Sequence, residues 1–203
     1  MRAGKGYLYE GGLRVPLLVR WPGKVKPGTV IDAPVQTTDW LPTMLEMLGV
    51  KPPSKLEGAS FAGVLTGTAK PAERPLFWHQ PHYTNQGGRP GSAVREGNWK
   101  LIEWAEDGSA ELFDLATDPG EATDISAKHP DRVKGLRARL AGWRKAVGAQ
   151  EMTPNPEFDA AKHKSLYLDP DPSKFAPATA LPKSFEAMQA WRKRIDAAVS
   201  TKK

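Results

Sequence analysis

The sequence predicts a mixed α and β fold in which a small antiparallel sheet packs against a long helix. Short apolar segments alternate with the turn dipeptides Gly97-Asn98 and Asp107-Gly108, a pattern that is typical of β-hairpins. The expected strands within residues 74–115 include Val94–Glu96, Leu101–Trp104 and Glu111–Leu115. A helical period follows the last of them, so sheet and helix are expected to share one core.

Large apolar side chains stand at both parities of the central strand. Trp99 and Leu101 point to one face, whereas Ile102 and Trp104 point to the other, because successive side chains of a strand alternate. Both faces of this sheet should therefore be covered.

One cover is a helix from Pro130 to about Val147. Proline suits a first helical position, and Gly148 suits the position just after the last turn. The apolar residues recur at spacings of three and four and form one stripe. They are Val133, Leu136, Leu140, Trp143 and Val147.

The first fifty residues predict a strand and then a helix. Val15–Trp21 is a short apolar run that ends at a Pro-Gly turn, and Asp39 begins a helix that ends at Gly49. The apolar residues of that helix, Leu41, Met44, Leu45 and Leu48, share one face. Residues 51–73 are rich in Pro, Gly, Lys, Ala and Thr and are expected to form a surface linker.

The end of the chain combines an irregular segment with a further helix. Residues 153–182 are proline-rich, and an amphipathic helix is expected after them. Its apolar face would be formed by Phe185, Met188, Trp191, Ile195 and Val199.

Composition excludes some classes of function. The 203 residues include no cysteine, so neither a disulfide framework nor a thiolate zinc site is possible. The net charge of +6 comes from 29 basic residues mixed with 23 acidic ones, which favours a solvated surface over a nucleic-acid binding face. No apolar stretch has the ~20 residues that a membrane span needs.

The most specific motif is the N-terminal run Gly-Lys-Gly-Tyr-Leu-Tyr-Glu-Gly-Gly-Leu-Arg-Val-Pro, residues 4–16. Together with Pro34–Thr43, it resembles the C-terminal part of the sulfatase family, and the bacterial branch most. Three later blocks resemble the C-terminal subdomain of that family in the same order. They are Arg74–Tyr83, Val94–Leu101 and the run from Glu111 through Glu121.

The resemblance implies a fold and a division of the chain. Residues 1–70 would be the end of an alkaline-phosphatase-like α/β catalytic domain, 71–150 an antiparallel sheet with a helix, and 151–203 a proline-rich tail with a terminal helix. The catalytic domain would supply the second cover of the sheet. Much of that domain would lie in an N-terminal portion missing from this chain.

The resemblance also implies a reaction, namely hydrolysis of aryl or carbohydrate sulfate esters. Members of the family use a formylglycine made from Cys or Ser in a Cys/Ser-x-Pro-x-Arg motif, and a divalent cation, here expected to be calcium. This chain has no cysteine and no Ser-x-Pro-x-Arg. The nucleophile and the metal ligands are therefore expected outside it, the chain alone is expected to be inactive, and no metal ligand is assigned here.

Three residues are candidates for the site. Lys5 matches the lysine of the family that contacts the sulfate, and its ammonium would stabilise the charge that builds during cleavage. His79 and His82, beside Trp78 and Tyr83, are candidates for substrate binding, with simple packing as the alternative. Glu10 and Arg14 are expected to form an ion pair that holds the intervening glycine turn.

Two other functions stay open. The chain could belong to a phosphoester hydrolase of the same superfamily, or it could be a non-catalytic module that binds a sulfated glycan or has only a structural role. By resemblance, the location would be periplasmic or secreted, although no signal peptide is visible in this chain.

Overall fold

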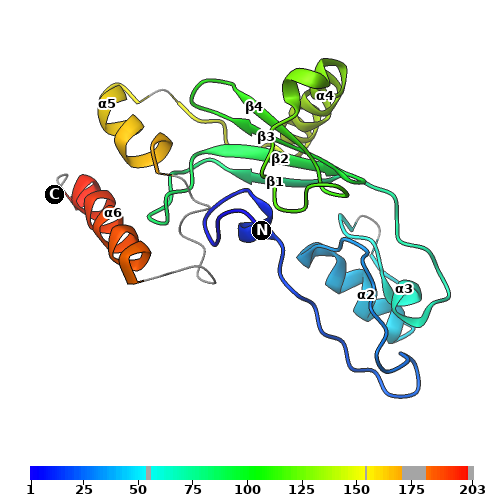
Figure 1. Ribbon diagram of the computed structural model, residues 1–203. Coiled ribbons are helices and arrows are strands. Elements are labelled where there is room, and N and C mark those ends of the chain that lie inside the picture. The colour runs from blue at the N-terminus through cyan, green and yellow to red at the C-terminus, as the bar shows by residue number, and fades with distance from the viewer. Residues whose placement is uncertain (54–55, 154, 171–181, 201–203) are drawn as a thin grey trace. The chain divides into compact units, whose positions relative to one another are not determined.

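A computed structural model describes residues 1–203 except 54–55, 154, 171–181 and 201–203 (Figure 1). The chain forms two compact units. One comprises Met1–Val15 and Phe77–Lys203, and the other comprises Pro16–Leu76. The predicted division at residues 70 and 150, which concerns parts of a longer protein, stays a prediction.

The first unit contains a four-stranded sheet in the order β1-β2-β3-β4 (Figure 1). The strands are β1 (Leu76–Gln80), β2 (Gly91–Glu96), β3 (Trp99–Trp104) and β4 (Ala110–Asp114). β2 pairs with β3, and β3 with β4, in antiparallel register. Glu96 lies opposite Trp99, so Gly97 and Asn98 form the predicted two-residue turn, in which Gly97 has a φ of 59°. The predicted fold class is confirmed.

One face of the sheet is covered by α4 (Pro130–Val147), at the bounds that the sequence predicts. Leu136 and Leu140 are buried against apolar side chains of β2, β3 and β4. The rings of Phe77 in β1 and Trp143 in α4 stack with centroids 4.9 Å apart. Gly148 follows in the left-handed conformation with a φ of 61°, which ends the helix.

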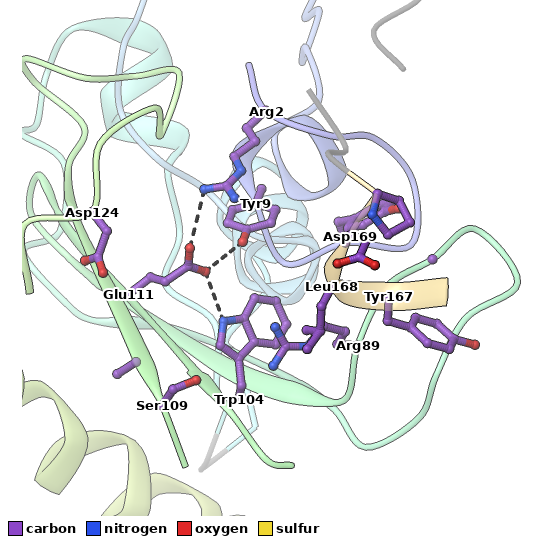
Figure 2. A pocket seen from close by; sticks show the side chains of 14 residues that line it. Arg2, Tyr9, Arg89, Trp104, Ser109, Glu111, Asp124, Tyr167, Leu168 and Asp169 are labelled. Carbon is purple, nitrogen blue, oxygen red and sulfur yellow. Dashed lines mark hydrogen bonds and ion pairs between the residues drawn. The ribbon is translucent and has the colours of Figure 1, made fainter. Parts of the chain in front are cut away.

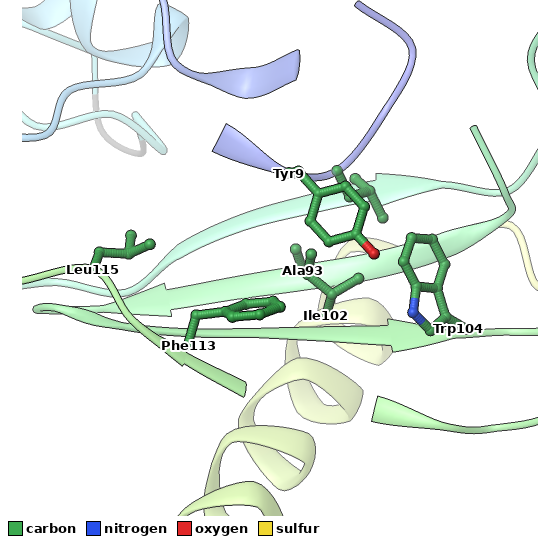
Figure 3. Packing of buried hydrophobic residues seen from close by; sticks show 7 residues of the cluster. Tyr9, Ala93, Ile102, Trp104, Phe113 and Leu115 are labelled. Carbon is green, nitrogen blue, oxygen red and sulfur yellow. The ribbon is translucent and has the colours of Figure 1, made fainter. Parts of the chain in front are cut away.

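The other face is covered by the first residues of the same chain. Leu8 and Tyr9 are buried against side chains from β2, β3 and the end of β4, as Figure 3 shows for Tyr9. The buried set comprises Leu8, Tyr9, Ala93, Ile102, Trp104, Phe113 and Leu115. A four-residue helix, α1 (Glu10–Leu13), follows. The expectation that both faces are covered is confirmed, and residues 8 and 9 provide the second cover.

The second unit holds a 3-10 turn η1 (Thr37–Asp39) and the helices α2 (Trp40–Met47) and α3 (Ala62–Thr66). The predicted strand at Val15–Trp21 is wrong: this run forms no strand, and Val15 and Leu18 are 77% and 92% exposed. A strand needs a hydrogen-bonded neighbour, and the run pairs with no strand among the described residues. The linker prediction for residues 51–73 missed α3.

The predicted α2 is present and ends at Met47, with Leu48 as its C-cap and Gly49 following at a φ of 66°. Asp39 does not cap α2 with its side chain; instead its carboxylate accepts hydrogen bonds from the backbone N–H groups of Gln36 and Ala59 at 2.7 and 2.9 Å. It also forms an ion pair with Arg74. Three residues of the predicted apolar face, Leu41, Met44 and Leu48, are exposed, whereas Leu45 is partly buried.

The tail forms α5 (Ala160–His163), a π-helical turn η3 (Lys164–Leu168) and α6 (Pro182–Ser200). The first two elements correct the expectation of irregular structure over 153–182. The terminal helix is present with Trp191 and Ile195 buried, while the side chains of Phe185 and Val199 lie outside the described residues. No helix among the residues described here is long and apolar enough to cross a membrane.

Candidate substrate site

Lys5 lies in an exposed turn at the start of the chain. The backbone N–H of Tyr7 donates to the carbonyl oxygen of Gly4 at 3.2 Å, and Gly6 has a φ of 94°, which favours glycine. The carbonyl oxygen of Gly6 accepts two side-chain hydrogen bonds, one from the last residue of β1 and one from the loop after it. Their donors are Gln80 Nε2 and Thr84 Oγ1, each at 3.2 Å. The Lys5 turn is therefore bound to that loop.

The same loop carries His82, which is exposed. Gln80 Nε2 also donates to the carbonyl oxygen of His82 at 3.4 Å, so one amide joins the backbone of the Lys5 turn to that of the His82 segment. The approach is close, since a Cβ placed on Gly88 would lie 1.7 Å from the carbonyl oxygen of Gly6. The fold thus brings Lys5 and His82 to neighbouring segments of one surface.

His79 lies on the opposite face of the sheet, with Phe77 and α4. Its Nδ1 lies 2.8 Å from Ser92 Oγ, and its Nε2 lies 2.8 Å from the carbonyl oxygen of Gln150. A carbonyl oxygen only accepts, so Nε2 carries a proton and donates, and in the neutral ring Nδ1 accepts from the serine hydroxyl. The structure does not bring His79 together with Lys5, and its role in substrate binding stays a prediction.

The paired glycines after Glu10 are required by close backbone contacts. A Cβ on Gly11 would lie 2.3 Å from the carbonyl oxygen of Arg2, and one on Gly12 would lie 2.2 Å from that of Tyr7. The backbone N–H of Gly11 donates to that Arg2 oxygen at 3.0 Å. The glycines therefore let α1 fold back on the Lys5 turn, because any larger residue would collide with backbone.

A buried charge cluster ties this motif to the sheet. Lys100 is fully buried, and its Nζ lies 3.0 Å from Glu10 Oε1 and 2.8 Å from Glu121 Oε1. Glu121 also accepts a hydrogen bond from the backbone N–H of Glu10. A second cation, Arg95, lies 3.9 Å from Glu10 Oε2. The expected Glu10–Arg14 pair is wrong, because Glu10 turns into the core toward Lys100 and Arg14 is exposed.

Sequence reasoning missed this cluster, although a signal was present. Lys100 occupies the same parity as Ile102 and Trp104, so its side chain had to point into a covered face. A lysine there needs a buried acidic partner. Burial raises the pKa of Glu121 above its usual value of 4.5, and the Lys100 ammonium opposes that shift.

A cavity of about 450 Å³ opens on the face covered by the N-terminal segment (Figure 2). Glu111 organises one wall, because its carboxylate accepts hydrogen bonds from Tyr9 Oη at 2.7 Å and Trp104 Nε1 at 3.0 Å. Arg2 lies 3.4 Å from Glu111 and stacks over the Tyr9 ring at 4.1 Å. Figure 2 shows these side chains converging on Glu111.

Two tyrosines of this cavity remain protonated over a wide range of pH. Burial, followed by the nearby Tyr167, raises the pKa of Tyr7 to about 12. Burial and then the Glu111 carboxylate raise the pKa of Tyr9 further. Both hydroxyls are therefore neutral at physiological pH and able to donate a hydrogen bond.

Calcium, which the family resemblance implies, does not fit the residues present. In the part of the chain that the structure describes, no group of three or more His, Cys, Asp or Glu side chains is placed to hold a metal ion.

The chain matches known sulfatases over most of its length. A family model described as N-sulphoglucosamine sulphohydrolase, C-terminal, matches residues 3–146. A sulfatase from Formosa agariphila is 33% identical over 187 residues, which cover 80% of this chain and 34% of the relative. An N-acetylglucosamine-6-O-sulfatase from Bacteroides thetaiotaomicron is 32% identical over 132 residues, covering 61% and 23%.

Solved structures share the fold. One, in complex with its substrate D-glucosamine-2-N,6-O-disulfate, matches with a TM-score of 0.59 and 29% identity over 68% of this chain and 30% of that one. Another, Ps i-CgsB, has also been solved with k-i-k-neocarrahexaose. It matches with a TM-score of 0.60 and 26% identity over 69% and 31%.

The chain spans about a third or less of the length of these curated relatives. The family match includes the Lys5 turn, the His82 loop, the sheet and nearly all of α4. The chain therefore belongs to the sulfatase family and corresponds to the C-terminal region of its members.

Proposed function

We propose that this chain is the C-terminal part of an enzyme that hydrolyses sulfate esters, and that Lys5 and His82 form its contribution to the active site. The observation that carries the proposal is the bound Lys5 turn. Gln80 links its backbone to the His82 segment, within the region matched by the sulfatase family. Carbohydrate sulfates are the favoured substrate class, because relatives bear that activity in their names.

Lys5 would bind the sulfate and stabilise the negative charge that grows on it and on the leaving oxygen. An exposed ammonium on a fixed turn suits this task, because its position is defined by the Gly6 hydrogen bonds while its end stays accessible. His82 would donate a hydrogen bond to the substrate from the adjacent loop.

The nucleophile and the cation would come from outside this chain. A hydroxyl of the formylglycine hydrate would be the nucleophile toward sulfur, and a divalent cation, calcium by family resemblance, would polarise the sulfate oxygens. This chain has no cysteine that could be converted. Its own residues would bind and orient the ester.

The test is sulfate release by the chain expressed as one polypeptide with the coding region that precedes it. 4-Nitrophenyl sulfate and glucosamine 6-sulfate serve as substrates, with 4-nitrophenyl phosphate as the comparison for a phosphoester hydrolase. Lys5→Ala is expected to lower kcat by about 10²–10³-fold, the usual cost of removing one group that stabilises developing charge. His82→Ala should mainly raise KM.

Lys24→Ala is the matched control, because Lys24 is also an exposed lysine but lies in the other unit. Equal activity of the Lys5→Ala and Lys24→Ala proteins would refute the assignment of Lys5. Faster release of phosphate than of sulfate would favour the phosphoesterase alternative. Calcium-independent binding of a sulfated glycan without turnover would favour a non-catalytic module.

A further inference from the structure

The cavity beside the Lys5 turn has the chemistry of a sugar-binding site. Its volume of about 450 Å³ falls within the ~300–1,000 Å³ range of small-molecule pockets. The lining includes the aromatic residues Tyr7, Tyr9, Trp104 and Tyr167. Arg2 stacks over the Tyr9 ring and Arg89 over the Trp104 ring, so Tyr7 and Tyr167 are the aromatic residues left for a ligand. Aromatic faces pack against the apolar faces of a pyranose ring, while hydroxyl and carboxylate groups satisfy the sugar hydroxyls.

The charged groups of the lining already have partners, which disfavours an ionic ligand. The Asp124 carboxylate accepts hydrogen bonds from the backbone N–H groups of Leu112 and Ser126, and the other charged groups form ion pairs. Arg2 pairs with Glu111 at 3.4 Å, and Arg89 pairs with Glu106 at 2.6 Å. The Asp169 carboxylate pairs with Lys164. A charged ligand would have to compete with these pairs, whereas a neutral polar ligand would not.

Two hydroxyls are available for such a ligand. Tyr7 and Tyr167 line the cavity, and within the described part of the chain their hydroxyl groups form no hydrogen bond. Burial keeps Tyr7 protonated, with a pKa of about 12. Each hydroxyl is able both to donate to and to accept from a sugar hydroxyl.

One wall comes from the tail, beyond the region matched by the family. Tyr167 of η3 lies against Tyr83 of the His82 loop with ring centroids 4.7 Å apart, and His163 Nε2 lies 2.6 Å from Glu106 Oε1. The family match ends at residue 146. Figure 2 shows Tyr167, Leu168 and Asp169 beside Arg89, so the tail closes the cavity from this side.

α6 holds this tail in place. A Cβ on Gly87 would lie 2.3 Å from the ring of Trp191 and from the hydroxyl oxygen of Tyr7, so the helix packs directly on the His82 loop. Trp191 Nε1 also donates to the carbonyl oxygen of Leu166 at 2.8 Å, which joins α6 to η3. Contacts of α6 with both η3 and the His82 loop therefore hold the wall that η3 supplies.

We propose that this cavity is a subsite for an uncharged sugar residue of a longer glycan, with Tyr167 as the wall supplied by the tail. The inference deepens the proposed function, on which it rests, because a sugar held here would extend from the sulfated residue at Lys5. The tail would then contribute to the choice of glycan without taking part in the chemistry.

The test measures binding of two neutral disaccharides, chitobiose and galactobiose, to the 203-residue chain by isothermal titration calorimetry. At least one is expected to bind with a Kd on the order of 1 mM. Tyr167→Ala should weaken that binding about tenfold, and Tyr7→Phe several-fold, through loss of an aromatic face and of a hydroxyl. Lys5→Ala should leave it unchanged, although it should lower the kcat of sulfate release by the full enzyme about 10²–10³-fold.

Phe158→Ala is the matched control, because Phe158 is an aromatic residue of the same tail that does not line the cavity. Circular dichroism reports whether each variant is folded, and Tyr7→Phe tests the cavity should Tyr167→Ala unfold the tail. No binding of either disaccharide at 20 mM, or equal weakening by Tyr167→Ala and Phe158→Ala, would overturn the subsite. Neither result would bear on Lys5, whose test is turnover.

Discussion

Replacing Lys100 by methionine would leave two carboxylates in the core without their shared cation. The Lys100 ammonium lies 3.0 Å from Glu10 and 2.8 Å from Glu121, and its side chain is fully buried. Methionine keeps most of the volume of the lysine stem but supplies no charge and no donor. Since Glu10 belongs to the segment that covers the second face of the sheet, the loss should loosen that cover.

The size of the effect follows from the burial of the pair. Removing one partner of a buried ion pair costs about 3–5 kcal/mol, compared with a total stability of about 5–15 kcal/mol for a domain. For a chain of this size, each kcal/mol lowers Tm by about 2–4 °C. Lys100→Met should therefore lower Tm by about 12 °C at neutral pH.

The assay is thermal unfolding followed by circular dichroism, with Lys134→Met as the control. Lys134 is exposed on α4, so its replacement should change stability by less than about 0.5 kcal/mol. Adding Glu121→Gln to Lys100→Met should recover about 2 kcal/mol, because it removes one of the unpaired carboxylates. A drop in Tm no larger than that of the Lys134 control would refute the reasoning.

Three further changes have expected outcomes. Gly12→Ala should cost about 3 kcal/mol by overpacking, because its Cβ would lie 2.2 Å from a backbone carbonyl oxygen, whereas Gly4→Ala meets nothing within 4 Å; urea unfolding compares the two. Because the pKa of Glu121 is raised in the folded protein, this side chain contributes most to the free energy of unfolding below about pH 4.5, where it is protonated, and the contribution is lost as pH rises. Glu121→Gln lacks this loss, so the stability of the variant relative to wild type should rise as pH increases above about 4.5; a flat difference would contradict the shift. Arg74→Ala should destabilise the second unit by about 2 kcal/mol, since it removes a charged hydrogen-bonding partner of the buried Asp39, and faster proteolysis around α2 would report it.

Local pattern was sufficient for much of the fold. The stripe of α4 and its flanking Pro130 and Gly148 fixed the helix at its observed bounds, because these signals act within a few residues of chain. The alternation in β3 correctly required cover on both faces. The apolar run Val15–Trp21 wrongly predicted a strand, because its pattern is local, whereas a strand forms only when another strand pairs with it.

The candidate site was predicted only in part. The N-terminal motif directed attention to Lys5, and the structure binds its turn to the His82 loop through Gly6. The same pattern gave Glu10 a partner four residues away, whereas its partners lie 90 and 85 residues distant, in β3 and β2. Charge pairing along the chain says little about pairing across the core, because long-range partners depend on which elements pack together.

By itself, the sequence determined the family, the strands around the Gly97-Asn98 turn and the long helix, since each is encoded by residues close together in the chain. Only the tertiary structure decided that residues 8 and 9 cover the sheet, that Lys100 joins Glu10 to Glu121, and that the tail closes a cavity on the N-terminal face. These features bring together segments far apart in the chain, such as Tyr7 and Tyr167, which line one cavity. Their energies arise from burial and geometry, which exist only once the chain has folded.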